Sequence, residues 1–313
     1  MPNRALISLV LKVSGNVNAD IGVGTRIPLK KIITWNQEIR PFVSARCIRR
    51  CIREKLFEKG FPIDPLQMIG PPGKEQLGDI GDPVKYIDDD LFGFLIAKEP
   101  PLRRSSPIKI SHLISLRHAE VKVEFAARFP RDFIPKYESG YPAPFEIELA
   151  DWLGKLNVIV SDRVGRFFDD ELSDDVKKQL GEQLELPKDE RFKRLSGFLE
   201  VLLWEGWNFP RGAQSPCVPE FYYAVVGLTK RFAPIFGHID INDEGKLNEN
   251  LIENMRKIYG QLLDKLFVID YKNGCCLRFE KDDKGNEKTS KIELGSVSMS
   301  DIISEICDYI IRK

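Results

Sequence analysis

Apolar residues alternate with polar ones in several segments, which is the pattern of half-buried β-strands. The first of these, Ala5 to Val13, ends at a Gly- and Asn-rich turn, and a loop is expected from there to about Val43. The later segments with a strand pattern are Asp88 to Ala97, Leu113 to Leu116, Glu120 to Ala126, Glu220 to Val226 and Leu266 to Tyr271. These segments predict a sheet whose strands are spread along the whole chain.

Two further pairs of strands are predicted to form hairpins. Phe145 to Leu149 and Leu156 to Val160 lie on either side of Gly154, which fits a turn between them. Cys275 to Phe279 and Lys291 to Leu294 flank a charged turn that contains glycine.

Apolar residues spaced three and four apart predict amphipathic helices. The first runs from Ala45 to about Glu58 with Ser44 as its N-cap, and Cys47, Ile48, Cys51, Ile52 and Leu56 share its apolar side. The other predicted helices are the acidic stretch ending at Glu185, the segment from Asp189 through Leu203 after Pro187, Asn248 to Lys265, and Ser300 to Ile311.

The order strand, helix, strands, helix, strand predicts an α+β fold, in which a split βαβ sheet carries its helices on one face. A chain of 313 residues fits one domain, residues 1–313, enlarged by insertions. We place these insertions at about residues 60–90, 98–117 and 235–265. The Pro- and Gly-rich stretch from Phe61 to Gly81 is expected to be a loop or an excursion from the core.

The composition, with 42% apolar and 30% charged residues, is ordinary for a globular protein. No stretch has the apolar length of a membrane span, and Ala5 to Val13 lacks the features of a signal peptide, so we expect a cytoplasmic protein. Six cysteines are too few for a disulfide scaffold, and we expect Cys47 and Cys51 to be reduced core residues. Their spacing and that of Cys275 and Cys276 do not match zinc sites, so neither a metal nor another cofactor is predicted.

The formal net charge is zero, but the charges are segregated along the chain. Between Arg26 and Leu56 the local balance is +7, and between Asp169 and Glu190 it is −6. This pattern favours a basic face for an anion and an acidic face turned away from it or toward a neighbouring protein. Two ordinary solvated surfaces would explain the same numbers.

Four arginines project from the polar side of the first helix. They are Arg46, Arg49, Arg50 and Arg53. Only Glu54 is near enough along the helix to pair with them, so an external polyanion is a natural counter-charge. The alternative is a solvated face that pairs with acidic loops elsewhere. A second basic stretch contains Arg103, Arg104, Lys109 and Arg117 among serines that can donate to phosphates, although a surface loop explains it equally well.

Six short motifs are spread over most of the chain. They are Asn16 to Gly22, Val43 to Arg50, Asp88 to Gly93, Arg104 to Leu116, Ser161 to Gly165, and Gly212 to Ser215. In order and spacing they resemble the DevR-like family of CRISPR-associated RAMP proteins, the repeated guide-RNA-binding backbone subunit of type I Cascade complexes. The resemblance implies an RNA-recognition-motif-like (ferredoxin-like) palm with finger and thumb insertions.

The resemblance also implies a function and partners. Several copies would stack along one CRISPR guide RNA and bind its backbone independently of sequence, while target DNA is recognised through pairing with the guide. The expected partners are the guide RNA, target DNA, further copies of the chain and other Cascade subunits. The predicted RNA-binding residues are Asn16, Asn18, Ser44, Arg46, Arg49, Arg50, Arg53, Arg103, Arg104, Lys109, His112, Arg163, Arg211 and Gln214.

The main alternative is a RAMP-type endoribonuclease, either metal-dependent or metal-independent. Its acid-base candidates would be His112, His118 and His238, none of which lies in a known catalytic signature. Asp88 and Asp90 would converge on a divalent ion if that segment were extended, but a capping or subunit-contact role is favoured. No nucleophile motif or phosphate-binding glycine loop is present, so we predict a non-catalytic protein. A DNA-binding regulator is disfavoured because no helix-turn-helix spacing surrounds the arginines.

Overall fold

The computed structural model describes residues 2–18, 22, 24–70, 72–97, 101–129, 141–180, 182–210, 217–281 and 287–311. Its helices are α1 (Ala45–Glu58), α2 (Ile87–Phe92), α3 (Asp174–Leu180), α4 (Lys188–Glu200), α5 (Glu249–Tyr259) and α6 (Ser296–Ile311). Its strands are β1 (Arg4–Gly15), β2 (Arg26–Ile27), β3 (Lys31–Ile33), β4 (Ile39–Val43), β5 (Gln67–Ile69), β6 (Gln76–Gly78), β7 (Phe94–Ile96), β8 (Leu102–Arg104), β9 (Ile108–Ile110), β10 (Leu113–Ser115), β11 (Lys122–Arg128), β12 (Ala143–Ser161), β13 (Glu220–Thr229), β14 (Lys265–Asp270), β15 (Cys275–Lys281) and β16 (Glu287–Glu293). Short 3-10 turns lie at Asp169–Glu171 and Ile235–His238, and a π-helical turn lies at Val201–Glu205. No described helix is long and apolar enough to cross a membrane.

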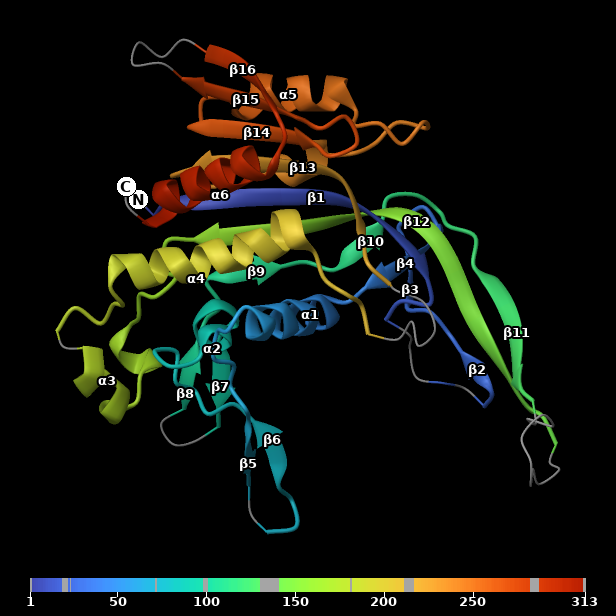
Figure 1. Cartoon of the computed structure of the whole chain (residues 1–313), viewed down its shortest axis with the longest axis horizontal. Coiled ribbons are helices and arrows are strands. Elements are labelled where there is room, and N and C mark those ends of the chain that lie inside the picture. The colour runs from blue at the N-terminus through green and yellow to red at the C-terminus, as the bar shows by residue number, and fades with distance from the viewer. Residues whose placement is uncertain are drawn as a thin grey trace.

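Strand β1 lies in the middle of the main sheet (Figure 1). It pairs antiparallel with β12 on one side and with β13 on the other, and β12 pairs antiparallel with β10. In chain order β1, α1, β10, β12, α4 and β13 form a β-α-β-β-α-β unit, and its strands lie in the order β13-β1-β12-β10. The predicted α+β fold with a split βαβ sheet is confirmed. Strands β14 to β16 extend this sheet beyond β13, and β4 and β3 extend it beyond β10.

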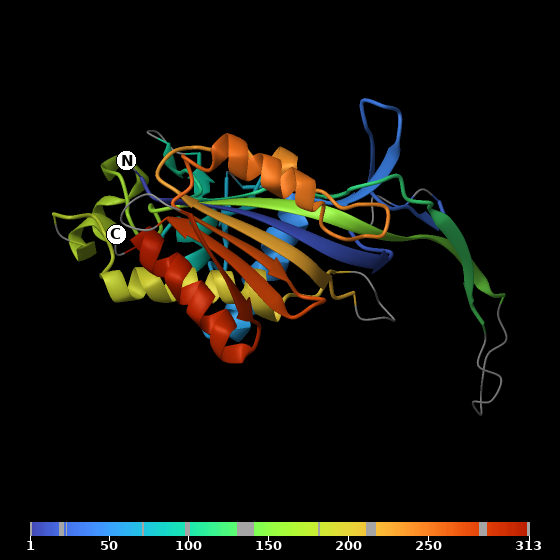
Figure 2. The same cartoon turned by 90° about the horizontal axis from the view of Figure 1, so that it is seen from above.

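Helices cover both faces of the main sheet. This is expected because β1 has apolar side chains on both of its faces, and each face must be buried. Its odd-numbered residues from Ala5 to Val13 pack against the apolar sides of α1, α4 and α6. Leu6 and Val10 point the other way and pack with Ile252 and Met255 of α5. Figure 2 shows α5 on one side of the sheet and α4 and α6 on the other. The expectation that all helices lie on one face is therefore wrong.

The segment predicted as a hairpin around Gly154 is instead one continuous strand, β12, of 19 residues. Gly154 sits inside this strand, and a Cβ there would come within 3.0 Å of the Ile114 carbonyl oxygen and within 2.3 Å of the Trp152 ring. Glycine at this position therefore permits the close approach of β10 and Trp152, rather than a turn.

The boundaries of several other elements also differ from those that the sequence predicts. The expected loop before Val43 contains β2, β3 and β4. The acidic helix is confined to Asp174–Leu180, and the helix expected to reach Lys265 ends at Tyr259. The charged hairpin of β15 and β16 is confirmed, and its turn lies outside the described residues.

Two hairpins project from the body (Figure 1). Strands β5 and β6 pair only with each other and lie within the first predicted insertion, residues 60–90. Strand β11 pairs with the first half of β12 to form a long arm. Within the other predicted insertions, β9 and β10 belong to the main sheet, and α5 covers its second face.

Candidate RNA-binding surface

Helix α1 separates an apolar side from an arginine side, as the sequence predicts. Cys47, Ile48, Cys51, Ile52 and Leu56 are all buried in the core below the sheet. Ser44 caps the helix, since its hydroxyl accepts a hydrogen bond from the Cys47 amide at 3.2 Å. The arginines consequently project from the remaining side of a helix that is fixed to the core.

Three distant segments meet at the N-terminus of α1. The Ser44 amide donates to Oδ1 of Asn18 at 2.7 Å, and the Ala45 amide donates to Nδ1 of His112 at 2.8 Å. Asn18 holds this position in a left-handed conformation, with φ of 53°, which asparagine tolerates well. Because Nδ1 of His112 accepts, its neutral ring carries the proton on Nε2, which is left to donate elsewhere. Three of the predicted residues, Asn18, Ser44 and His112, are thus brought together.

The four arginines of α1 are not equivalent. Arg46 is exposed, and no described residue offers it a hydrogen bond or ion pair; Arg49 donates only to the Ala45 carbonyl of its own helix, at 3.4 Å. Burial lowers the pKa of Arg49, and repulsion from Arg53 and Arg46 lowers it further. An anion bound next to Arg46 and Arg49 would offset this repulsion.

The other two arginines are already paired. Arg50 donates to Glu54 at 3.0 Å, as expected from their spacing. Nε of Arg53 lies 2.9 Å from Oδ2 of Asp88, and its guanidinium also packs over the Phe92 ring at 5.0 Å. Glu54 is the local partner that the spacing predicts, and for Arg53 the alternative of pairing with an acidic residue elsewhere in the chain is the one observed, because α2 brings Asp88 against it.

Asn16 has an internal role in the structure. Its amide donates to the Glu148 carbonyl at 2.8 Å, next to the buried Glu148 side chain. That carboxylate in turn accepts from the Leu29 amide and from Arg26 and Lys31. Burial tends to raise the pKa of Glu148, but the Lys31 and Leu29 hydrogen bonds outweigh it and the pKa is lowered. Glu148 therefore holds the basic segment before β4 in place. The strand pattern around Glu148 does not predict this role.

The second basic stretch divides between different surfaces. Arg103 is exposed on β8, whereas the guanidinium of Arg104 has no exposed surface and cannot reach RNA. Lys109 is exposed, but it pairs in register with Ile159 and so faces the side of the sheet that α5 covers, opposite α1. Arg117 donates to Asp240 at 2.9 Å.

The remaining predicted residues add little to this surface. Arg163 donates to Glu171 at 2.6 Å and stacks on Phe168 at 4.0 Å. Arg211 and Gln214 lie outside the described residues. Lys30 is a further basic residue near this surface, since it lies close enough to Cys47 of α1 to help lower the pKa of that thiol.

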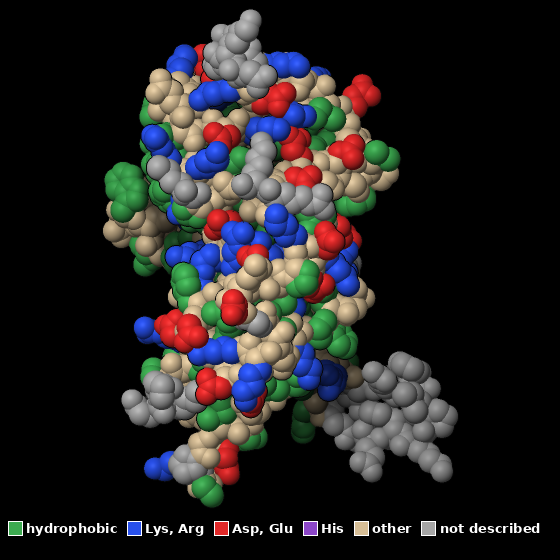
Figure 3. Space-filling view, turned by 90° about the vertical axis from the view of Figure 1, so that its left-hand side faces the viewer, with side chains coloured by type: hydrophobic (Ala, Val, Ile, Leu, Met, Phe, Trp, Pro, Cys, Tyr) green, Lys and Arg blue, Asp and Glu red, His purple; other side chains and the backbone are tan. Residues whose placement is uncertain are grey.

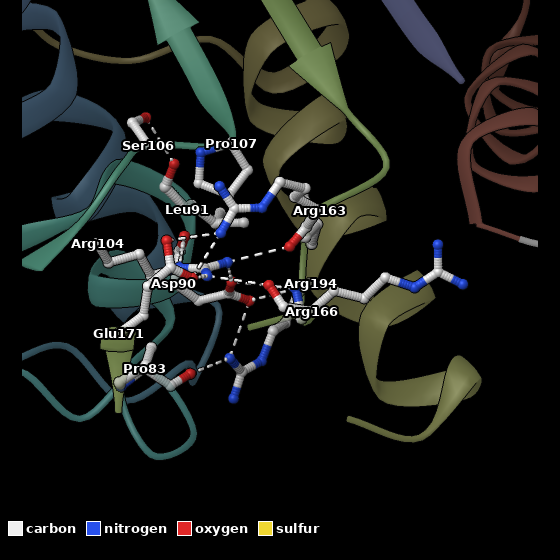
Figure 4. A network of polar contacts seen from close by, with 12 residues as sticks. Pro83, Asp90, Leu91, Arg104, Ser106, Pro107, Arg163, Arg166, Glu171 and Arg194 are labelled. Carbon is white, nitrogen blue, oxygen red and sulfur yellow. Dashed lines mark hydrogen bonds and ion pairs between the residues drawn. The ribbon is translucent and has the colours of Figure 1, made fainter. Parts of the chain in front are cut away.

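Arg104 instead belongs to a buried ionic network (Figure 4). It donates to Oδ1 of Asp90 at 2.6 Å and to Glu171 at 2.8 Å. The other Asp90 oxygen accepts from Arg194 of α4 at 3.1 Å, and the Gly165 amide donates to both oxygens at 3.0 Å. The network thus joins α2, β8, the segment after β12 and α4.

Residues 81–249 match the family described as CRISPR-associated negative auto-regulator DevR/Csa2, which is more than half of the chain. The chain belongs to this family. No curated protein matches it.

Two solved chains resemble this DevR/Csa2 protein at 11% sequence identity each. One, from a "CRISPR RNA-guided surveillance complex, pre-nicking", has a TM-score of 0.59 and covers 97% of this chain and 100% of its own. The other, from a "CRISPR RNA-guided surveillance complex", has a TM-score of 0.47 and covers 82% and 83%. The similarity to the first of these two chains shows a shared fold.

The segment that matches the DevR/Csa2 family contains the whole Asp90 network. Two of its glycines are required by packing. A Cβ at Gly93, which has φ of 71°, would lie 2.3 Å from the Arg104 carbonyl oxygen, and one at Gly165 would lie 2.5 Å from Arg191. The motifs beginning at Asp88, Arg104 and Ser161 therefore meet in the core, where they stabilise the DevR/Csa2 fold.

The acidic segment of this DevR/Csa2 protein is less isolated than its local balance indicates. Glu171, Glu185 and Glu190 pair with arginines from the same end of the molecule. Figure 3 shows acidic and basic side chains interspersed over that end. The exposed remainder includes Asp174 and Asp175, with side chains more than 90% exposed. Part of the predicted acidic face is thus neutralised by arginines of the same end of the molecule.

The three consecutive aspartates of this DevR/Csa2 chain lie in helix α2 and not in an extended segment, so the convergence of Asp88 with Asp90 is not observed. Asp89 instead lies beside Asp64 and Asp79, with carboxylate oxygens of all three within 4.8 Å of one another. Burial and the carboxylates of Asp64 and Asp88 raise the pKa of Asp89 to about 8.

Replacing Asp89 with Asn is expected to remove a pH-dependent contribution to stability. Because the folded-state pKa is raised, protonated Asp89 stabilises the fold at low pH, and this contribution is lost as pH rises from about 4 to about 8. Asn keeps an acceptor for the Asp82 amide. The free energy of unfolding of the Asn variant, relative to that of the wild type, should therefore increase by at least about 1.4 kcal/mol between pH 5 and pH 8.5. Urea unfolding at several pH values measures this, and a constant difference would contradict it.

Proposed function

We propose that this protein is a non-catalytic subunit that binds the backbone of a CRISPR guide RNA independently of sequence. Several copies coat one guide and form the helical backbone of a type I Cascade complex. Its partners are the guide RNA, further copies of itself, other Cascade subunits, and target DNA through pairing with the guide.

The observation that carries this proposal is the cationic pair Arg46 and Arg49, which forms no ion pair with a described residue and follows the site where Asn18, Ser44 and His112 meet. The amides of Ser44, Ala45 and Cys47 already have protein acceptors, so we assign phosphate binding mainly to the arginine side chains. Arginine forks and an imidazole Nε2–H suit phosphate and ribose oxygens and read no base identity. Family membership and the fold shared with a chain of an RNA-guided complex support guide RNA as the polyanion.

The alternative of an endoribonuclease receives less support from the geometry. The three histidines serve different parts of the fold: Nδ1 of His112 binds the Ala45 amide, His118 lies 3.1 Å from the Ile39 carbonyl oxygen, and His238 packs against Tyr259. None of these printed contacts brings two of the histidines together, as acid-base cleavage by a pair of histidines would require.

A gel-shift titration against single-stranded RNAs of increasing length, with magnesium present and product sizes checked, tests the proposal. We expect stepwise shifts whose number grows with RNA length, without cleavage and without preference for one sequence. Binding should weaken with salt in proportion to the phosphates contacted, by about 0.7 log units per contact for each tenfold rise in salt. Cleavage would favour the nuclease, and absence of binding at low salt would refute direct RNA binding.

A further inference from the structure

A tryptophan at the tip of the β3–β4 hairpin is almost fully exposed. Trp35 is 94% exposed, and Ile33 and Ile39, which pair in register on the two strands, are 70% and 43% exposed. Directly paired residues point to the same side of a hairpin, so the two isoleucines lie together beside the tryptophan. We call these three side chains the apolar tip. Apolar side chains gathered on an exposed projection indicate an interaction site.

The turn that presents Trp35 is held by hydrogen bonds. The Thr34 amide donates to the Glu38 carbonyl at 3.0 Å, and the Gln37 amide donates to the Thr34 carbonyl at 2.9 Å. The Thr34 hydroxyl also accepts from the Glu38 amide at 3.2 Å. A partner would therefore meet an aromatic anchor that is already in place, so little conformational entropy is lost on docking.

The charges of this hairpin favour a protein partner over RNA. Strands β3 and β4 carry two cations, Lys31 and Arg40. Arg40 pairs with Glu38 at 2.6 Å, and Lys31 pairs with the buried Glu148 at 2.6 Å. Surfaces that stack RNA bases combine aromatic side chains with cations that are left to bind phosphates. An aromatic anchor beside neutralised charges is instead typical of the centre of a protein–protein interface.

A groove of about 730 Å³ lies at the other end of the main sheet, between α5 and strands β13 to β16. Its apolar lining includes Ile252 of α5 and the cross-strand neighbours Val268 and Leu277. Leu277 is partly exposed, so α5 leaves some of this sheet face uncovered. Glu249 and Asp270 also line this α5 groove. Their carboxylates can accept the hydrogen bond that the N–H of a buried indole requires.

The apolar tip and the α5 groove are placed for a contact between two copies of the chain. Strands β3 and β14 lie at the two ends of the order β14-β13-β1-β12-β10-β4-β3, roughly 29 Å apart at about 4.8 Å per strand. Figure 2 shows the β3–β4 hairpin and α5 extending to the same side of the sheet. A projection and a groove at opposite ends of one chain form a heterologous contact, which can repeat along an open array.

We infer that the Trp35 indole of one copy docks in the α5 groove of the next copy and joins the two head to tail. Burial of a tryptophan removes roughly 150–250 Å² from water. A groove of this volume is in the range that encloses a drug-sized molecule, which is larger than an indole. The inference rests on the proposed function, in which several copies share one RNA, and it names a contact between them.

Two substitutions remove the two halves of this contact. Trp35→Ala removes the anchor, and Leu277→Arg places a charge in the groove. Neither position lies on α1, so each variant should bind an RNA that holds one copy as tightly as the wild type does. On an RNA that holds several copies, the wild type should load cooperatively. In each variant the affinity for the second copy should fall at least roughly thirtyfold, as measured by gel shift.

An equal mixture of the two variants tests whether the two halves meet. The Leu277→Arg chain keeps its tryptophan and the Trp35→Ala chain keeps its groove, so one intact contact remains. The mixture should therefore load RNA in cooperative pairs and no further, and sedimentation velocity distinguishes pairs from longer arrays. The control is Val297→Ala, an exposed apolar position on α6, which lies on the other face of the sheet. This variant should load as the wild type does.

Unchanged loading by Trp35→Ala would overturn the inference, as would a mixture that forms no pairs although both variants bind the short RNA. Weaker binding of Trp35→Ala to the short RNA, with unchanged affinity for the second copy, would assign the indole to RNA instead. Failure of the proposed function has a different signature, because the wild type would then bind neither RNA. Sedimentation of the RNA-free chain at high concentration would still decide the contact, since the wild type should self-associate and Trp35→Ala should not.

Discussion

Replacing Asp90 with Ala is expected to lower the free energy of unfolding by about 3–5 kcal/mol. The Asp90 side chain is fully buried, and its oxygens bind Arg104 and Arg194, which are themselves buried. Removing the carboxylate leaves two desolvated guanidiniums without their shared counter-ion and the Gly165 amide without its acceptor. The cost is that of uncompensated buried charge, which exceeds the net contribution of the intact ion pairs.

Urea unfolding followed by circular dichroism measures this change. The control is Asp175→Ala, because that side chain is 91% exposed and its ion pair, with Lys178, lies at the surface. Its effect should stay within about 0.5 kcal/mol. Equal unfolding midpoints for Asp90→Ala and wild type would show that the network does not hold α2 and α4 together.

The double variant Arg46→Ala, Arg49→Ala should lose most of its RNA affinity and little stability. Each arginine that contacts phosphate contributes roughly 1.5–3 kcal/mol, so a loss of at least about a hundredfold is expected. The slope of log affinity against log salt should become less negative by about 1.4 if each arginine contacts one phosphate. No ion pair to a described residue is broken at either position.

Two comparisons make this test specific. Lys178→Ala with Lys188→Ala removes the same charge from exposed positions at the acidic end and should change RNA affinity little. Arg53→Ala should instead lower stability, because it leaves buried Asp88 without its cation. Equal RNA affinity for the Arg46, Arg49 variant and the lysine variant would exclude α1 as the RNA-binding element.

The features that the sequence predicted well are those set by local spacing. The limits of α1, its Ser44 cap and its two sides follow from interactions within one or two helical turns. Strand-like apolar segments likewise located β1 and β13, although both strands are buried on their two faces and not on one. These elements are determined by residues that are close in sequence, so they can be predicted without knowing the rest of the fold.

The features that the sequence did not predict depend on contacts between residues that are far apart in the chain. Nothing near Arg104 shows that its counter-ion is Asp90, or that Arg194 shares it, so a basic side chain was assigned to RNA. Asp88 was assigned to an extended segment because the apolar run after it continues past Gly93, where the backbone reverses. The sequence placed Asn18 and His112 on the RNA-binding surface only through the family resemblance, and their meeting at α1 required the structure.

Strand β12 has a mechanical consequence for any assembly. Its pairing with β1 ends at Ala150, and its pairing with β11 begins at the next residue, Leu149, so no break separates palm from arm. A strand of 19 residues spans roughly 60 Å, and an unbroken ladder bends only as a sheet does. The arm is therefore expected to be rigid, with no hinge between it and the main sheet. In the proposed assembly, a partner that bound the end of the arm would therefore be held at a distance from the main sheet that the strand itself fixes.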